Sequence, residues 1–299
     1  MEELAIYVNQ SPYVFKGVQA PFTSAKIVVL GAPFDSTSTY RPGSRFAPSA
    51  IREASANIES YSWRAKVDSE AVATHDLGDL VVVQGDVKTT LSRLERLVQR
   101  LRGAGKLPII IGGEHTITYA AVTGLGRPAL LCFDAHLDLR DEYPVGVKLS
   151  HATVIRRVAE VVGCGAIFMV GVRAACLEEV EYAEGRGVRA VTSWEAEEVG
   201  PMEVARRIRE WAEKFDRVYV SIDLDVLDPS YAPGVANPEP EGLRPGLLLD
   251  VLNLTLDQRV VGLDLVEVSP PYDNGLASIH AARILLEAVA YLSRRATGP

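Results

Sequence analysis

Six acidic and imidazole side chains fall in three short segments at spacings that suit a metal centre. They are His115, Asp134, His136, Asp138, Asp223 and Asp225. In the segments DAHLD and SIDLD they alternate with other residues, and on an extended chain residues two apart point to the same side. The remaining histidine follows a Gly-Gly pair in the segment GGEH, which predicts a tight turn. Each segment is therefore expected to present its ionisable groups together.

Four carboxylates and two imidazoles brought to one place would repel one another strongly unless a cation lay between them. A ligand set dominated by oxygen suits hard divalent ions such as manganese better than it suits zinc, which favours cysteine and histidine. With carboxylates available to bridge, the set suits two ions about 3.5–4 Å apart, which can hold a shared water as hydroxide near neutral pH. The chemistry that these residues predict is metal-assisted hydrolysis.

The elements that must position these residues are short apolar runs that alternate with amphipathic stretches. Eight runs are typical of strands: 26–30, 72–77, 107–111, 129–133, 166–170, 188–191, 217–222 and 260–266. Helical spacing occurs between them, as in segments 91–101 and 201–215. Because the strands are apolar at nearly every position, we expect a parallel sheet covered by helices on both faces. This predicts one α/β domain over residues 1–299, with a closed (β/α)₈ barrel as the alternative.

The candidate ligands follow directly after these runs. The third, fourth, seventh and eighth runs end in IIIGGEH, LLCFDAHLD, VYVSIDLD and DLVEVSPPYD. In open parallel sheets and in barrels alike, sites form at the carboxyl ends of strands. A single DxD pair is more often a turn or a helix cap than a pair of ligands, and a single histidine after Gly-Gly is more often a loop contact. Their joint occurrence at several strand ends favours the metal site.

The motifs GGEH, DAHLD, SIDLDVLDPSYAPG and EVSPPYD, in this order, resemble the ureohydrolase family of arginases and agmatinases, as does RPGSRFAPSAIR at residues 41–52. The resemblance extends from about residue 26 to 290. It implies a three-layer α/β/α sandwich with a largely parallel eight-stranded sheet and two manganese ions. One ion would be held by His115, Asp134, Asp138 and Asp223. The other would be held by Asp134, His136, Asp223 and Asp225.

The resemblance also implies a reaction and the residues that carry it out. An activated water would attack the guanidinium carbon of a small cationic substrate, and the tetrahedral intermediate would collapse to urea and an amine. Glu267 matches the carboxylate that holds the guanidinium group, and His151 matches a histidine assigned to proton transfer. With Asp138, these are the expected catalytic residues. The alternative interpretations are a strand-end surface charge for Glu267 and a helix start capped by Ser150 for His151.

Composition excludes other classes of function. The 299 residues contain 31 Lys+Arg and 39 Asp+Glu, a net charge of −8 without a basic run, so nucleic acid is not an expected partner. No apolar run approaches the roughly 18 residues of a membrane span, and the opening segment MEELAIYVNQ does not resemble a secretory signal. A cytoplasmic protein is therefore expected. Cys132, Cys164 and Cys176 are interpreted as core thiols.

Four other ionisable residues match no metal motif. We expect His75 and His280 to be structural, the first at a strand end and the second in a helix. Asp76 and Asp79 are expected to close a turn around Gly78.

The substrate is the least determined feature. Arg140, Asp141 and Glu142 follow the second ligand motif, and the two acids would suit the distal ammonium of agmatine, giving putrescine and urea. Aminopropylagmatine would suit the same acidic residues. Guanidinobutyrate would fit if Arg140 faced the cleft, and arginine is a further possible substrate. Other classes are a dinuclear hydrolase of different bonds and a non-catalytic, metal-stabilised binding protein. Divalent ions other than manganese are possible, and the family commonly forms homotrimers or homohexamers.

Overall fold

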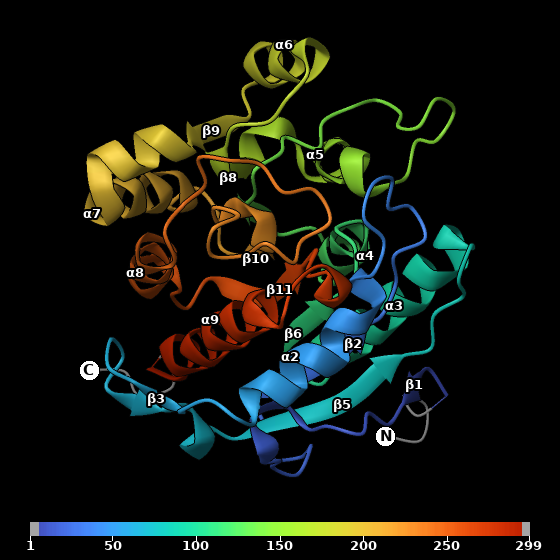
Figure 1. Cartoon of the computed structure of the whole chain (residues 1–299), viewed down its shortest axis with the longest axis vertical. Helices are drawn as coiled ribbons and strands as arrows, with labels where there is room; N and C mark the ends of the chain where they lie inside the picture. Colours follow the sequence, from blue (N-terminus) through green and yellow to red (C-terminus); the bar gives the residue numbers. More distant parts are fainter. Residues whose placement is uncertain (1–5, 295–299) are drawn as a thin grey trace.

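A nine-stranded sheet runs through the centre of the molecule in the order β1-β5-β2-β6-β11-β10-β7-β8-β9 (Figure 1). The computed structural model describes residues 6–294. The strands of the sheet are β1 Val8–Asn9, β2 Ile27–Ala32, β5 Thr74–Leu80, β6 Leu107–Gly112, β7 Ala129–Phe133, β8 Ile167–Val172, β9 Arg189–Thr192, β10 Val218–Asp223 and β11 Val260–Val266. A separate two-stranded hairpin joins β3 Tyr61–Ser62 to β4 Val67–Asp68.

Eight of the nine strands are parallel, and each overlaps one of the eight predicted runs, with bounds that differ by up to three residues. The predicted α/β class and largely parallel sheet are confirmed. The short strand β1 is an addition that pairs antiparallel with β5 at one edge. Because the sheet is open, with β1 and β9 at its edges, the alternative of a closed barrel is wrong.

Helices cover both faces of the sheet and give three layers (Figure 1). One face packs α2 Ala47–Ser55, α7 Ser193–Ala212, α8 Pro245–Thr255 and α9 Leu276–Ser293. The other packs α3 Val87–Gly103, α4 Ile117–Gly124, α5 Val154–Val162 and α6 Leu177–Arg186. The single domain over residues 1–299 stays a prediction, and its first and last five residues lie outside the described part of the chain.

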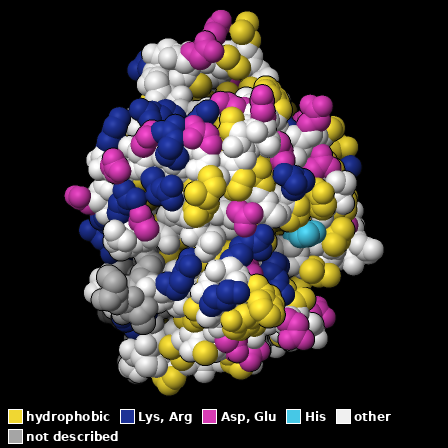
Figure 2. Space-filling view, turned by 90° about the vertical axis from the view of Figure 1, so that its left-hand side faces the viewer, with side chains coloured by type: hydrophobic (Ala, Val, Ile, Leu, Met, Phe, Trp, Pro, Cys, Tyr) yellow, Lys and Arg dark blue, Asp and Glu magenta, His cyan; other side chains and the backbone are white. Residues whose placement is uncertain are grey.

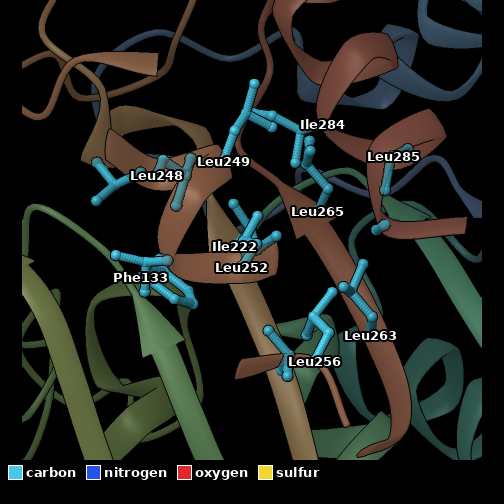
Figure 3. Close-up of a cluster of buried hydrophobic side chains, with 14 of the residues drawn as sticks. Phe133, Ile222, Leu248, Leu249, Leu252, Leu256, Leu263, Leu265, Ile284 and Leu285 are labelled. Atoms are coloured by element: carbon cyan, nitrogen blue, oxygen red, sulfur yellow. The ribbon is translucent and has the colours of Figure 1, made fainter. Parts of the chain in front are cut away.

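The largest core lies between the sheet and helices α8 and α9. Figure 3 shows Leu248 and Leu252 of α8 and Ile284 of α9 over Ile222 of β10 and Leu263 of β11. All five side chains are 1% exposed or less. Each one buried in this way contributes about 1.5–3 kcal/mol to folding. The central strands are thereby fixed in place, and so are the residues at their carboxyl ends.

Local signals explain where the helices begin and bend. Asp86 caps α3, since its side chain accepts a hydrogen bond from the backbone N–H of Thr89. Helix α7 begins at Ser193, earlier than the predicted 201–215, and its backbone is interrupted at Gly200, directly before Pro201. Proline cannot donate the hydrogen bond that a continuous helix needs there. The predicted helix is therefore the second half of α7.

Helix α9 is long and apolar enough to span a membrane by length and composition, with a mean hydropathy of 1.3 over 18 residues. However, 72% of that stretch is buried inside the protein, and α9 packs against α2 and α8. Its apolar character is that of a core helix. His280 lies in this helix, as predicted.

A buried ion-pair cluster links α2 to β5. Arg52 is fully buried, and its Nε lies 2.7 Å from Asp76 while its Nη1 lies 2.6 Å from Asp79. The prediction for Gly78 is right in part. The segment continues as strand β5 instead of turning, with Gly78 at a φ of +94°, but Asp76 Oδ1 does accept a hydrogen bond of 3.0 Å from the N–H of Gly78. The carboxylates bind a guanidinium group because two buried negative charges require a cation. His75 is structural, as predicted, because its Nδ1 lies 2.9 Å from the carbonyl of Ala20.

Replacing Arg52 with methionine should lower the free energy of unfolding by about 3–5 kcal/mol, because two carboxylates would lose their partner in the interior. Denaturant unfolding of both proteins would measure the change. The matched control is Arg206→Met in α7. Helix α7 lies on the left in Figure 1, and that side of the molecule, shown in Figure 2, carries basic and acidic side chains intermingled. Arg206 is 51% exposed and pairs with Glu203, so its loss should cost under about 1 kcal/mol. Equal effects of the two variants would contradict the structural role given to Arg52.

Candidate active site

The six predicted ligands come together at the carboxyl edge of the sheet. They follow strands β6, β7 and β10, which lie at its centre with β11 among them (Figure 1). The turn after β6 is as tight as the Gly-Gly pair predicts. A Cβ atom at Gly113 would lie 1.9 Å from the carbonyl oxygen of Phe34, so only glycine fits. This turn brings His115 into the interior, where it is 1% exposed.

One imidazole nitrogen faces three carboxylates. His115 Nδ1 lies 3.2 Å from Asp134 Oδ2, 3.1 Å from Asp138 Oδ2 and 3.4 Å from Asp223 Oδ2. This nitrogen is buried and has no hydrogen-bond partner among the described residues. Three carboxylate oxygens therefore lie around one imidazole nitrogen.

A second group of ligand atoms shares Asp134 with the first. His136 Nδ1 lies 3.0 Å from Asp225 Oδ2 and 3.6 Å from Asp134 Oδ1. Asp134 thus turns one oxygen toward each histidine. Atoms bound at about 2.1 Å to one ion, at right angles, lie about 3 Å apart. The donors present and their spacing therefore fit two divalent ions.

Without cations the cluster is electrostatically strained. Burial raises the pKa of Asp138 to about 7, assisted by the charge of Asp134. Burial and the charges of Asp225 and Asp134 raise the pKa of Asp223 well above its usual value. Burial also tends to raise the pKa of Asp134. The hydrogen bonds and charges of His115 and His136 outweigh this effect and lower the pKa of Asp134. The site holds more negative charge than its own side chains neutralise.

Two residues of the site have a backbone conformation that is rare outside glycine. Asp138 has a φ of +49° and Glu267 a φ of +64°. Each is fixed by a backbone hydrogen bond: the N–H of Arg156 donates to the carbonyl of Asp138 at 3.0 Å, and the N–H of Glu267 donates to that of Gly113 at 2.8 Å. Such conformations cost about 1 kcal/mol or more and concentrate at functional sites.

Glu267 follows β11 and is buried, so the alternative of a surface charge is wrong. Its Oε1 accepts a hydrogen bond of 2.6 Å from the backbone N–H of His115. Its Oε2 is buried without a partner among residues 6–294, and Glu267 lines the cavity that contains the ligands. Burial, with the nearby charge of Glu114, raises its pKa well above the usual value.

His151 lines the same cavity and also begins a helical turn after Ser150. Its role in proton transfer stays a prediction. Its Nδ1 is 3.4 Å from Thr37 Oγ1, and its Nε2 is 3.3 Å from Thr39 Oγ1. Burial lowers the pKa of His151 to about 4, so the imidazole is uncharged near neutral pH. Glu114, which the sequence analysis passed over inside GGEH, accepts hydrogen bonds from the backbone and side chain of Thr37 and so anchors this loop.

The cavity has a volume of about 440 Å³, and its outer wall differs from the predicted rim. Asp141 and Glu142 do not line it. The Asp141 carboxylate turns to Arg157 at 3.1 Å and Lys148 at 3.4 Å. Arg140 does line the cavity, stacked over Tyr143 with its guanidinium carbon 4.8 Å from the ring centre.

The sequence analysis missed two acidic residues of the outer wall, Glu179 and Glu239. Glu179 is buried and lies 3.6 Å from Arg140 Nε. Glu239, with a side chain 43% exposed, lies 4.0 Å from His136 Nε2. Glu239 is held by Arg173, whose Nη2 donates to its backbone carbonyl at 2.8 Å. The signal for Glu239 was its place in the PEPEG segment after the third ligand motif.

The three cysteines are free, as predicted, but only Cys132 is fully buried. Its Sγ lies 3.9 Å from both His115 Nε2 and Asp134 Oδ2. Burial raises the pKa of this thiol to about 12, so it stays protonated. Cys132, His115 and Asp134 lie close enough together to hold an ion, as do Asp134, His136 and Asp225. A hard divalent ion prefers the oxygen and nitrogen donors of these groups to sulfur.

Comparison with known proteins identifies the family. The Arginase family model matches residues 25–291. The chain is 36% identical over 269 residues to an agmatinase of Bacillus anthracis, covering 87% of this chain and 89% of the relative. It is 33% identical over 273 residues to an N(1)-aminopropylagmatine ureohydrolase of Thermococcus kodakarensis, covering 90% and 92%. The crystal structure of an agmatine ureohydrolase of Thermoplasma volcanium superimposes with a TM-score of 0.88 at 37% identity over 99% of both chains.

The chain therefore belongs to the Arginase family. It is a ureohydrolase, an enzyme with the arginase-like α/β fold, and the family depends on a binuclear metal centre. The alternative of a non-catalytic binding protein is set aside.

Replacing Asp223 with asparagine should remove at least one ion and abolish urea formation, because the variant loses a buried negative charge that faces His115 and adjoins Asp225. Elemental analysis and a urea assay on the same sample would measure both, and Asp134→Asn should behave alike. Asp141→Asn, outside the cavity, is the control and should keep metal and rate. An Asp223→Asn enzyme with two ions and a normal rate would contradict the metal site.

Proposed function

We propose that this chain is an agmatinase that hydrolyses the guanidinium group of agmatine to give putrescine and urea. His115, Asp134, Asp138 and Asp223 would hold one divalent ion, and Asp134, His136, Asp223 and Asp225 the other. Manganese suits this set of oxygen and imidazole donors. When bound, such a pair supplies a water that is ionised near neutral pH for attack on a poor electrophile.

The observation that carries this proposal is the free oxygen of Glu267. Its Oε1 is held by the backbone of His115, while its buried Oε2 has no partner in the described chain and belongs to the wall of the cavity. A guanidinium group presents a planar fork of N–H donors and a positive charge, which complement a carboxylate oxygen of this kind. Glu267 would therefore orient the guanidinium group beside the ligand cluster.

His151 would transfer a proton to the leaving amine. Its imidazole is uncharged near neutral pH because burial disfavours the protonated form. A neutral ring can accept a proton and then deliver it to the departing amine, and Thr37 and Thr39 fix its orientation. Asp138 acts as a ligand whose strained backbone directs its carboxylate toward His115.

The charges of the outer wall favour a substrate with a second positive charge. Arg140 would attract a carboxylate, which is the specific observation in favour of guanidinobutyrate. However, Glu179 lies 3.6 Å from Arg140 and offsets its charge. Glu239 then adds a negative charge to the wall, and it would attract the ammonium group of agmatine. The agmatinase and the agmatine ureohydrolase among the relatives also support agmatine as the substrate. The relative that acts on aminopropylagmatine makes this longer polyamine the second candidate.

Glu267→Gln should retain both ions but lower kcat/KM by about 10²-fold or more, because the charge that complements the guanidinium group is lost. Steady-state urea release and metal content measured together would test this. A kcat/KM within a few-fold of the parent would assign Glu267 a structural role only.

Agmatine should give the highest kcat/KM among agmatine, aminopropylagmatine, arginine and guanidinobutyrate, each measured by urea release with manganese present. In Glu239→Gln we expect KM for agmatine to rise about tenfold, since one charge-assisted contact is lost. Glu142→Gln is the matched control and should leave KM unchanged because Glu142 does not line the cavity. A preference for arginine or guanidinobutyrate would overturn the agmatinase assignment and leave the ureohydrolase mechanism intact.

We also propose that the enzyme is cytoplasmic, that it forms a homotrimer or homohexamer, and that it binds neither nucleic acid nor membrane. The net charge of −8 supports the lack of nucleic-acid binding. The burial of α9 supports the lack of membrane binding.

A further inference from the structure

A buried chain of polar side chains lies behind His115, on the side away from the cavity. Ser221 of β10 and Asp264 of β11 are paired in register in the sheet, and both are 0% exposed. Ser221 Oγ donates a hydrogen bond of 2.6 Å to Asp264 Oδ1 and lies 3.0 Å from His115 Nε2. The three side chains thus form a continuous line from the interior of the sheet to the ligand cluster.

Asp264 is an unusual residue for the middle of a central strand. Its Oδ2 accepts hydrogen bonds from Thr118 Oγ1 at 2.7 Å and from Tyr219 OH at 2.8 Å. A buried carboxylate that receives three hydroxyl donors is satisfied as an acceptor. An apolar side chain would be the ordinary choice at this position. The carboxylate therefore requires a reason beyond packing.

The direction of the hydrogen bonds in this line follows from the number of protons available. A serine hydroxyl has one hydrogen, and Ser221 directs it to Asp264. At the contact between Ser221 and His115, the serine oxygen must then accept, and His115 Nε2 must carry the hydrogen. Cys132 Sγ, at 3.9 Å from the same nitrogen, is a weaker alternative partner. A histidine whose Nε2 holds its one proton presents a lone pair at Nδ1.

That lone pair belongs to the nitrogen that faces the three carboxylates. We propose that Asp264 is a positioning residue of the metal centre, which acts through Ser221 to hold His115 in the orientation and tautomer that bind an ion through Nδ1. Carboxylates behind metal-bound histidines act in this way in other proteins. The inference depends on the proposed metal centre and is independent of agmatine as the substrate.

The second histidine lacks such support. His136 is 23% exposed at its side chain, and its Nε2 lies 4.0 Å from Glu239, which is itself 43% exposed. The relay from Asp264 therefore affects one of the two ions. Loss of this relay should weaken the binding of the ion at His115 and leave the binding of the other ion largely unchanged.

The test is to add manganese to the metal-stripped protein and to measure its binding by calorimetry and by electron paramagnetic resonance. The parent should bind two ions and show the signal of a coupled pair. In Ser221→Ala, one of the two binding steps should weaken by about 10–100-fold, so that limiting manganese gives a single-ion signal. Asp264→Asn should weaken the same step, because an amide N–H directed at Ser221 would reverse the hydrogen bond to His115.

Tyr219→Phe is the matched control. It removes a hydroxyl from Asp264 Oδ2 in the same buried cluster but leaves the line from Oδ1 through Ser221 to His115 intact. It should bind both ions as the parent does, whereas Ser221→Thr, which keeps a hydroxyl, should recover part of the lost affinity.

Two results would overturn the proposal: parent-like binding of both ions by Ser221→Ala, or equal weakening in Tyr219→Phe. A parent protein that binds no manganese would overturn the metal centre and the relay together. Two bound ions without urea release from agmatine would count against the proposed substrate only.

Discussion

Mutual repulsion among buried carboxylates is the constraint on which the rest of this structure depends. Four aspartates and Glu267 meet at one edge of the sheet, and burial raises the pKa of Asp138, Asp223 and Glu267. Folding places these groups together at a cost that only cations can offset. The aliphatic layers under α8 and α9 provide the rigidity to hold them there (Figure 3). The packed aliphatic core therefore supplies the stability that keeps the mutually repelling carboxylates together at the edge of the sheet.

The sequence predicted the parts of the molecule that depend on short-range patterns. Most of the parallel strands were visible because they are apolar at nearly every position, as in β7 and β8, whereas β5 and β9 contain polar or exposed residues. The six candidate ligands were visible because acidic and histidine residues two apart point to the same side of an extended chain. Strand β1 was not, since it has only two residues, Val8 and Asn9, and no pattern can develop over that length. The interruption of α7 at Gly200 was signalled by the following proline, but the first half of that helix was not.

Charges in loops and in the interior were harder to predict, because their partners are distant in the sequence. Asp141 turns away from the cavity toward Arg157, sixteen residues later. Asp76 and Asp79 both bind Arg52 of α2, a partner more than twenty residues away, and only Asp76 also bonds the N–H of Gly78. Asp264 was hidden in the apolar run GLDLVEV, although an acidic residue inside a buried strand is itself a signal. In each case tertiary packing decided where the charge points.

The order of the central strands has a consequence for how this chain is made. β6 pairs with β2 and β11, and β7 pairs with β8 and β10. During synthesis from the N-terminus, β6 and β7 each wait with one unpaired side until residues 218–266 have left the ribosome. Such edges invite pairing with other chains. The last candidate ligands, Asp223 and Asp225, lie at the end of β10, the strand that also covers the open side of β7. The nascent chain therefore completes its candidate metal site as that edge is covered.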